Sequence, residues 1–348
     1  MMAFLRFIFI LTFLFPFIPG ILVSDIQPLF IVVGAICFFV SSDRVLFVPM
    51  LLLTFLLFYS ILFFDELTIK VLVSIIGYVV TFEVFRRVDF AILSRALWVY
   101  FSITLVGALI HYVDLNFWGE VRETLSLRNS NYEYYSQFAP EPSMYYIQLI
   151  AIYAAIVWFG DYKLRVMYAI TSIVTFILGS DLALLLLLIP VAVELSLLFF
   201  TKEKLFFLGN LASFFILFTF GACFLLFPDL FMVFIEYFHR SEQVRIYDVG
   251  QIYYSFTKNP IGMSEYKSMM VNFSLDYPGR FREDSLGSTS ALSNIIYSIG
   301  GVGFLFFIFI IRFYFKYLGI FLLSISSTIG LSWFPLALII CRKRNCNA

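Results

Sequence analysis

The stretch Leu205–Phe227 (LFFLGNLASFFILFTFGACFLLF) carries no charged residue from end to end. A helix needs about 20 consecutive apolar residues to cross the hydrocarbon core of a bilayer. In lipid, every backbone N–H and C=O group must be satisfied within the protein, so a spanning segment of this kind is helical. The stretch therefore predicts a transmembrane helix.

Comparable apolar stretches recur along the whole chain. Of the 348 residues, 62% are hydrophobic and 13% are charged, which is about half the charged fraction of an average soluble domain. The sequence therefore predicts an all-α polytopic membrane protein with about 11–12 transmembrane helices in a single transmembrane domain, residues 1–348. The expected spans are 5–23, 26–40, 45–64, 71–85, 91–112, 144–159, 166–180, 182–200, 205–227, 289–311 and 317–341.

Basic residues indicate the orientation of these spans. With the N-terminus inside, the short outer loops contain only Lys70, whereas the short inner loops are rich in Lys and Arg. The inner basic residues are Arg44, Arg86, Arg87, Lys163, Arg165, Lys202, Lys204, Arg312 and Lys316. This asymmetry predicts that loops 113–143 and 239–288 lie outside. Glu83 and Glu194 fall inside or near span ends, close enough to the inner face for their carboxylates to reach it.

The charge of the C-terminal tail is inconsistent with this orientation. An odd number of spans places Arg342-Lys343-Arg344 outside, where basic residues are disfavoured. Either 317–341 is a re-entrant hairpin that turns at Ser326–Gly330, or a further span lies near 228–238. The sequence leaves both alternatives open.

The two outer loops hold most of the polar chemistry. A connector of about fifty residues is uncommon unless it is functional or disordered, and the aromatic content of 239–288 argues against disorder. We expect a folded cap over a cavity at the membrane face; the alternative is a solvated loop with interfacial tyrosines. The sequence contains no HExxH, Walker-type glycine loop, GxSxG or paired CxxC motif. A net charge of zero gives no electrostatic argument for nucleic acid.

What these loops offer is arginine, carboxylate and tyrosine. Arginine binds phosphate oxygens in a bidentate manner, a carboxylate can act as a general base, and aromatic faces stack on sugar rings. This combination favours transfer of a sugar from a lipid-pyrophosphate donor to a sugar hydroxyl. Few candidate metal ligands accompany it, since only two histidines are present and the four cysteines are scattered.

Several short motifs resemble bacterial O-antigen polymerases of the Wzy type, within the O-antigen ligase and polymerase superfamily. The resemblance covers about residues 90–312 and follows the family's order of features. The motifs are Arg128 before Glu141-Pro142-Ser143, Gly179-Ser180-Asp181, Arg245-Ile-Tyr through Lys258-Asn259-Pro260-Ile-Gly262, and Ser288-Thr289-Ser290 through Gly300-Gly301-Val-Gly303. Three residues depart from the family. Thr289 and Ser290 stand where the related ligases have His-Asn. Asp181 replaces an arginine of the family, so the hairpin that contains Gly179-Ser180-Asp181 cannot bind phosphate directly.

The resemblance implies a GT-C-like glycosyltransferase in the bacterial inner membrane with both long loops in the periplasm. It would join undecaprenyl-pyrophosphate-linked oligosaccharide repeat units, without metal or other cofactor, in a membrane that also holds a chain-length regulator and a flippase. The expected catalytic residues are Glu141, Arg128, Arg245 and Asp284. The expected substrate-binding residues are Arg240, Arg280, Arg282, Tyr247 and Lys258. The bland alternatives are that Arg128 and Arg245 pair with loop carboxylates and that Glu141 is a carboxylate favoured at a helix N-terminus.

Other functions fit the sequence less well. A polysaccharide flippase or other transporter would need charges within its spans and often shows an inverted repeat, whereas the charges here lie mainly in two loops. An O-antigen ligase would need the histidine that Thr289 and Ser290 replace. A structural subunit would have no use for a large aromatic and basic loop.

Overall fold

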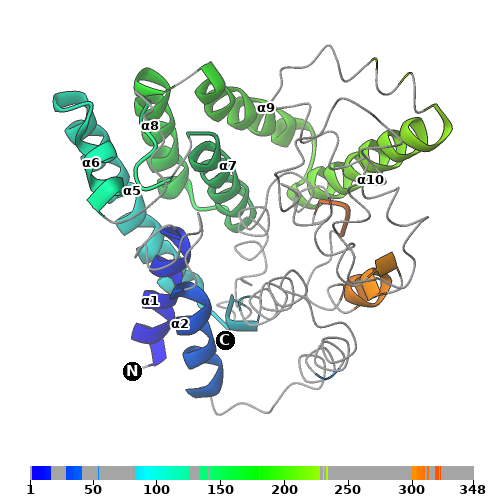
Figure 1. Ribbon diagram of the computed structural model, residues 1–348, viewed down its shortest axis with the longest axis horizontal. Coiled ribbons are helices and arrows are strands. Elements are labelled where there is room, and N and C mark those ends of the chain that lie inside the picture. Colours follow the sequence, from blue (N-terminus) through cyan, green and yellow to red (C-terminus); the bar gives the residue numbers. More distant parts are fainter. Residues whose placement is uncertain are drawn as a thin grey trace. The chain divides into compact units, whose positions relative to one another are not determined.

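The computed structural model describes the chain in segments. The described residues are 2–16, 29–40, 54, 81, 83–85, 87–124, 134–139, 142–179, 181–227, 230, 233, 300–301, 303–309, 312, 318–320 and 322. Most of them are helical, and no β-strand occurs among them (Figure 1). The chain divides into two compact units. Unit 1 comprises Met1–Asp43, Val80–Leu205 and Phe334–Ala348, and unit 2 comprises Arg44–Val79 and Phe206–Trp333.

The described helices follow the apolar stretches of the sequence. They are α1 (Met2–Leu14), α2 (Leu29–Val40), α5 (Phe90–Val113), α6 (Phe117–Thr124), α7 (Pro142–Phe159), α8 (Tyr162–Leu178), the 3-10 helix η1 (Asp181–Leu184), α9 (Leu185–Phe199) and α10 (Lys202–Leu226). Helices predicted over 91–112, 144–159, 166–180 and 205–227 are thus confirmed. Of the described helices, α5 and α10 are long and apolar enough to cross a membrane.

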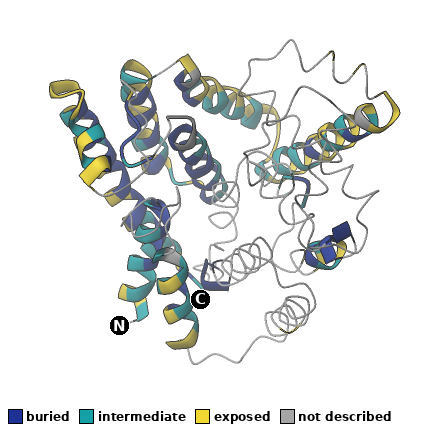
Figure 2. Cartoon of the chain, in the orientation of Figure 1, coloured by how far each residue is buried: buried dark blue, intermediate teal, exposed yellow. Residues whose placement is uncertain are grey.

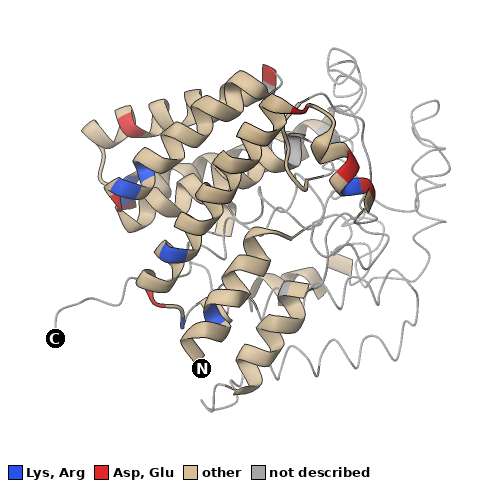
Figure 3. Ribbon diagram, turned by 90° about the vertical axis from the view of Figure 1, so that its left-hand side faces the viewer, with Lys and Arg blue, Asp and Glu red and all other residues tan. Residues whose placement is uncertain are grey.

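In unit 1, α5 packs on α8 and α1, and α7 packs on α8 and α9. The rings of Phe90 and Phe159 lie 5.0 Å apart, so α5 begins beside the end of α7. The α7–α8 turn passes through Gly160 at φ +75°, with Lys202 Nζ beside it. The predicted inner basic residues Lys163 and Lys202 therefore lie at the same end of the unit. Charged residues lie mostly near helix ends, with uncharged stretches between them (Figure 3).

Many large apolar side chains of unit 1 point away from its core. Along α9, Leu188, Val191, Leu195 and Leu198 are all more than half exposed. The same helix turns Leu186 inward, where it is fully buried. Figure 2 shows that buried and exposed residues alternate along each of these helices. A continuous exposed apolar face of this kind is rare on a soluble monomer.

Helix α1 is shorter than the span predicted over 5–23. It ends at Leu14, and Phe15 and Pro16 form a bend and a turn. A residue that precedes proline is disfavoured in the α conformation, which explains the stop. The Leu14 carbonyl, which the ended helix leaves free, accepts a 2.5 Å hydrogen bond from Gln148 Nε2 of α7.

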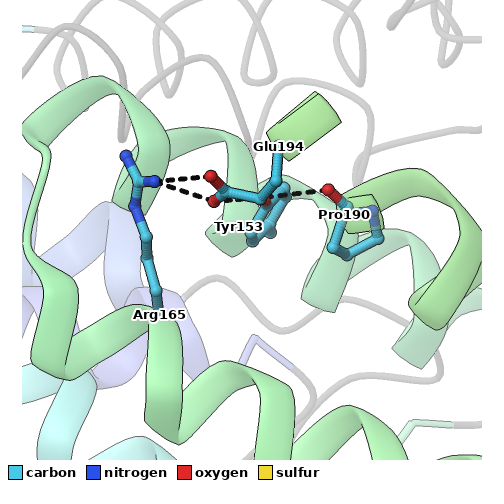
Figure 4. Close-up of polar contacts among 4 residues, drawn as sticks. All are labelled: Tyr153, Arg165, Pro190 and Glu194. Atoms are coloured by element: carbon cyan, nitrogen blue, oxygen red, sulfur yellow. Dashed lines mark hydrogen bonds and ion pairs between the residues drawn. The ribbon is translucent and has the colours of Figure 1, made fainter. Parts of the chain in front are cut away.

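The two span-end carboxylates are paired with arginines. Glu83 lies 3.2 Å from Arg87 and is buried, with 2% exposure. Glu194 of α9 accepts two 2.8 Å hydrogen bonds from Arg165 Nη1 of α8 (Figure 4). Tyr153 of α7 donates a third, 2.9 Å long, to the same carboxylate. This triad joins three helices at one point.

Candidate functional site

The residues predicted to form the site lie outside the described part of the chain. These are Glu141, Arg128, Arg245, Asp284, Arg240, Arg280, Arg282, Tyr247 and Lys258. Their roles stay predictions. Part of the first predicted outer loop, 113–143, is described, namely α6 and residues 134–139, and it contains a cluster that the sequence did not single out.

Helix α6 places an aromatic ring and a cation on one face. Trp118 and Arg122 are four residues apart, which puts them on the same side of a helix. Both are buried, whereas Glu120 and Glu123 of the same helix are exposed. The Trp118 Nε1–H donates to the Gly107 carbonyl of α5 at 3.0 Å. The polar face of α6 is thus turned outward, and Arg122 is turned into the protein.

Tyr135 anchors the second described part of this loop. Its N–H donates to the Leu178 carbonyl at the end of α8 (3.0 Å), and its hydroxyl donates to the Thr104 carbonyl of α5 (2.6 Å). Burial raises the pKa of the Tyr135 phenol well above its usual range, so the hydroxyl stays a neutral donor. Its ring lies 5.6 Å from that of His111 and 6.3 Å from that of Trp118. Over the described residues, the loop is therefore a folded cap, here called the cap, on the ends of α5 and α8.

One nitrogen of the Arg122 guanidinium, Nη1, makes its hydrogen bonds to the described residues. Nη1 donates to Ser136 Oγ at 2.6 Å, to the Gln137 carbonyl at 3.1 Å and to the Ala139 carbonyl at 3.2 Å. Gln137 adopts φ 50°, a left-handed conformation that costs free energy in a residue with a side chain, and its carbonyl is one of the three acceptors. We call these four residues, Arg122, Ser136, Gln137 and Ala139, the Arg122 site.

The Arg122 site lacks a negative charge among the described residues. Arg122 is 1% exposed, all three of its acceptors are uncharged, and no described carboxylate forms an ion pair with it. Its Nε is buried without a hydrogen-bond partner, as is Nε2 of Gln137. Burial lowers the pKa of the guanidinium. Burying an uncompensated ion costs several kcal/mol, so the arrangement favours an anion that supplies the missing charge.

The chemistry of this site is that of anion binding. The Nε–Nη2 edge of arginine presents two parallel donors, the geometry that matches two oxygens of a phosphate or carboxylate. No hydrogen bond joins either of these atoms to a described residue. Within the described segments, no three His, Cys, Asp or Glu side chains come together in a group that could hold a metal ion.

The sequence held a signal for this site. Within Phe117-Trp118-Gly119-Glu120-Val121-Arg122, the spacing of Trp118 and Arg122 indicates a helix that buries both. Such spacing indicates an amphipathic helical turn within a charged loop. The acceptors Ser136, Gln137 and Ala139, which lie 14 to 17 positions further along, cannot.

The chain was compared with models of protein families, with curated proteins and with solved structures, and none of these comparisons finds a match.

Proposed function

We propose that this chain is a polytopic inner-membrane glycosyltransferase that polymerises undecaprenyl-pyrophosphate-linked oligosaccharide repeat units at the outer face of the membrane. The acceptor hydroxyl attacks the anomeric carbon of the donor glycan. A new glycosidic C–O bond forms, the bond from that carbon to the pyrophosphate oxygen breaks, and undecaprenyl pyrophosphate leaves. The hydroxyl proton passes to a general base, for which Glu141 is the first candidate and Asp284 the second.

A membrane location is supported by the helices themselves. Both α5, with 24 residues, and α10, with 25, reach the length that the hydrocarbon core requires. The exposed leucines of α9 are costly in water and favourable against lipid chains. Within unit 1, the basic residues of the predicted inner loops lie where α5 begins and α7 ends, and the cap lies at the opposite ends of these helices.

The observation that carries the proposal is the buried guanidinium of Arg122, which forms no ion pair with any described carboxylate. Negative charge develops on the leaving pyrophosphate as the glycosidic bond breaks, and a cation positioned in advance lowers that barrier. The site lies in the described part of a predicted periplasmic loop, where such a donor would enter. Because Nε is buried, an oxyanion would reach it only when the cap opens locally.

Other residues of the proposal come from the resemblance. Arg128 and Arg245 would share the pyrophosphate with Arg122, while Arg240, Arg280, Arg282, Tyr247 and Lys258 would contact the sugars. The cations would take the part that a divalent metal plays in other phosphate-leaving reactions, so no metal is required. The proposed partners are the lipid-linked glycans, with a flippase that supplies them and a regulator of chain length.

A gel of the lipopolysaccharide ladder tests the role of Arg122. In a strain that lacks the gene, plasmid-borne Arg122→Gln should restore no ladder, and Arg122→Lys should restore little, because lysine is a point charge without two fixed donors. Losing one preorganised donor lowers the rate about 10²–10³-fold. Arg95→Gln is the matched control, since Arg95 is an exposed arginine on α5 outside the site.

Membrane levels of each variant are checked by immunoblot, so that a loss of polymer is compared at equal protein. Wild-type ladders from both Arg122 variants would remove Arg122 from the site. A full ladder from Arg122→Lys with none from Arg122→Gln would keep a role for the charge but reject bidentate binding.

A further inference from the structure

The segment that contacts Arg122 is a single β-turn. The Ala139 N–H donates to the Ser136 carbonyl at 3.0 Å, so residues 136–139 form a four-residue turn with Gln137 and Phe138 at its centre. Directly before this turn, Tyr135 is fixed to α5 and α8 by its two hydrogen bonds. The 136–139 turn therefore begins at a fixed point of the cap.

Two side chains of α6 hold the turn in place. Nη1 of Arg122 donates to one side-chain oxygen and two carbonyl oxygens of the turn. The hydroxyl that accepts the 2.6 Å bond, Ser136 Oγ, itself donates to the Ala139 carbonyl at 3.2 Å. The Phe138 ring lies edge to face against Trp118, with ring centroids 4.9 Å apart. The turn thus occupies the guanidinium that the proposed function assigns to a substrate.

Gln137 is an unfavourable residue for its position in the turn. It is the second residue of four and has φ 50°. Turns with a positive φ at this position are formed mostly by Gly, Asn and Asp, because a longer side chain is strained there. The buried Nε of Arg122 makes no hydrogen bond to a described residue either. The closed turn therefore carries a backbone cost and a stranded donor, both of which opening relieves.

We infer that the 136–139 turn is a latch, which closes the Arg122 site when no ligand is bound and opens when an oxyanion takes its place on the guanidinium. The inference rests on the proposed function, in which Arg122 binds the lipid-linked pyrophosphate. An oxyanion offers charged acceptors in place of three uncharged ones, and hydrogen bonds between charged partners are roughly twice as strong. On opening, Gln137 leaves its left-handed conformation and Nε gains an acceptor.

The rate at which phenylglyoxal, an arginine-specific reagent, modifies Arg122 tests the latch. The full-length chain is treated in a neutral detergent, and mass spectrometry of its peptides gives the rate at each arginine. Arg122 is buried and should react only through the open state, far more slowly than the exposed Arg95. Ser136→Ala removes the 2.6 Å acceptor and should raise the Arg122 rate roughly tenfold. Ser196→Ala, which removes a hydroxyl bonded to a carbonyl of its own helix α9, should leave the rate unchanged.

Two substitutions of Gln137 should change this rate in opposite directions. Gln137→Asn should lower the Arg122 rate, because asparagine adopts the left-handed conformation more readily and stabilises the closed turn. Gln137→Val should raise the rate, because a β-branched residue is strained there. The rate at Arg95 should stay the same in both variants. If the turn had only a structural role, no substitution of Gln137 would close the site further.

Three results would overturn the inference: wild-type Arg122 that reacts as fast as Arg95, Arg122 that is inert in every variant, or an Arg122 rate that none of the turn variants changes. Inorganic pyrophosphate separates the latch from the proposed function. It should protect Arg122 of the Ser136→Ala variant in a saturable manner. A rate that follows the turn variants without protection by pyrophosphate would support the latch and contradict the anion-binding role of Arg122.

Discussion

At position 107, the absence of a side chain lets α5 approach the cap. A Cβ there would lie 2.7 Å from Cζ2 of Trp118 and 2.7 Å from the Tyr135 hydroxyl. These two aromatic side chains connect the cap to α5 through the hydrogen bonds to the Gly107 and Thr104 carbonyls. The position of the Arg122 site therefore depends on a glycine in a neighbouring helix.

Substitution of this glycine should displace the cap. Gly107→Ala is expected to destabilise the protein by about 1–3 kcal/mol, the usual cost of overpacking, and to lower both Tm and polymer yield. Gly119→Ala on α6 is the control, because a Cβ there meets nothing within 4 Å. An unchanged Tm and ladder for Gly107→Ala would mean that the cap does not pack on α5 as described.

The sequence predicts the ingredients of the Arg122 site but not its assembly. Arginine, serine and glutamine in an outer loop are visible in the sequence, and Trp118–Arg122 spacing indicates which face is buried. Whether an arginine pairs with a carboxylate or stays uncompensated depends on contacts between Arg122 and residues 136–139. The sequence-based prediction put weight on Arg128 and Arg245, which match family motifs, and passed over Arg122, which matches none.

At the scale of elements, the Tyr153–Arg165–Glu194 triad links α7, α8 and α9 (Figure 4). Glu194→Gln should destabilise the protein more than Tyr153→Phe, because it leaves Arg165 without an anion, and Arg165 Nε already lacks a partner. The tyrosine hydroxyl is worth about 1 kcal/mol. The measurement is thermal unfolding, with Tyr162→Phe, an exposed tyrosine of α8, as the control.

A double variant separates coupling from independent effects. Arg165→Gln with Glu194→Gln should cost less than the sum of the single changes, since each single change strands the other partner. The two side chains are 23% and 42% exposed, so screening reduces the effect. Strict additivity would show that the ion pair contributes nothing to the packing of α8 and α9.

Helices with long apolar stretches could be predicted from sequence, and shorter or interrupted elements could not. The bounds of α5 and α7 agree with the expected spans within two residues. Helix α6 has eight residues, half of them polar, so its sequence does not predict a membrane-spanning helix. The bend at Phe15–Pro16 and the 3-10 turn of η1 occur inside predicted spans, because proline and local packing override hydropathy there.

At the scale of the whole molecule, orientation is the property that the function depends on most. Reporters fused within loops 113–143 and 239–288 should report the periplasm, and fusions near Arg86 or Lys202 should report the cytoplasm. Within unit 1, Lys202 and the α7–α8 turn lie together, at the other ends of the helices from the cap. A cytoplasmic signal from either long loop would reverse the orientation and place the Arg122 site on the wrong side for lipid-linked repeat units.

Polymerisation by the purified chain tests the central proposal most directly. The protein is mixed with undecaprenyl-pyrophosphate-linked single repeat units and a strong chelator, and products are separated by mass. The account predicts oligomers of two or more repeats, with one undecaprenyl pyrophosphate released for each bond formed, and little product from Arg122→Gln. Two results would contradict it: no oligomer from correctly folded protein, or product formation that requires added magnesium or manganese.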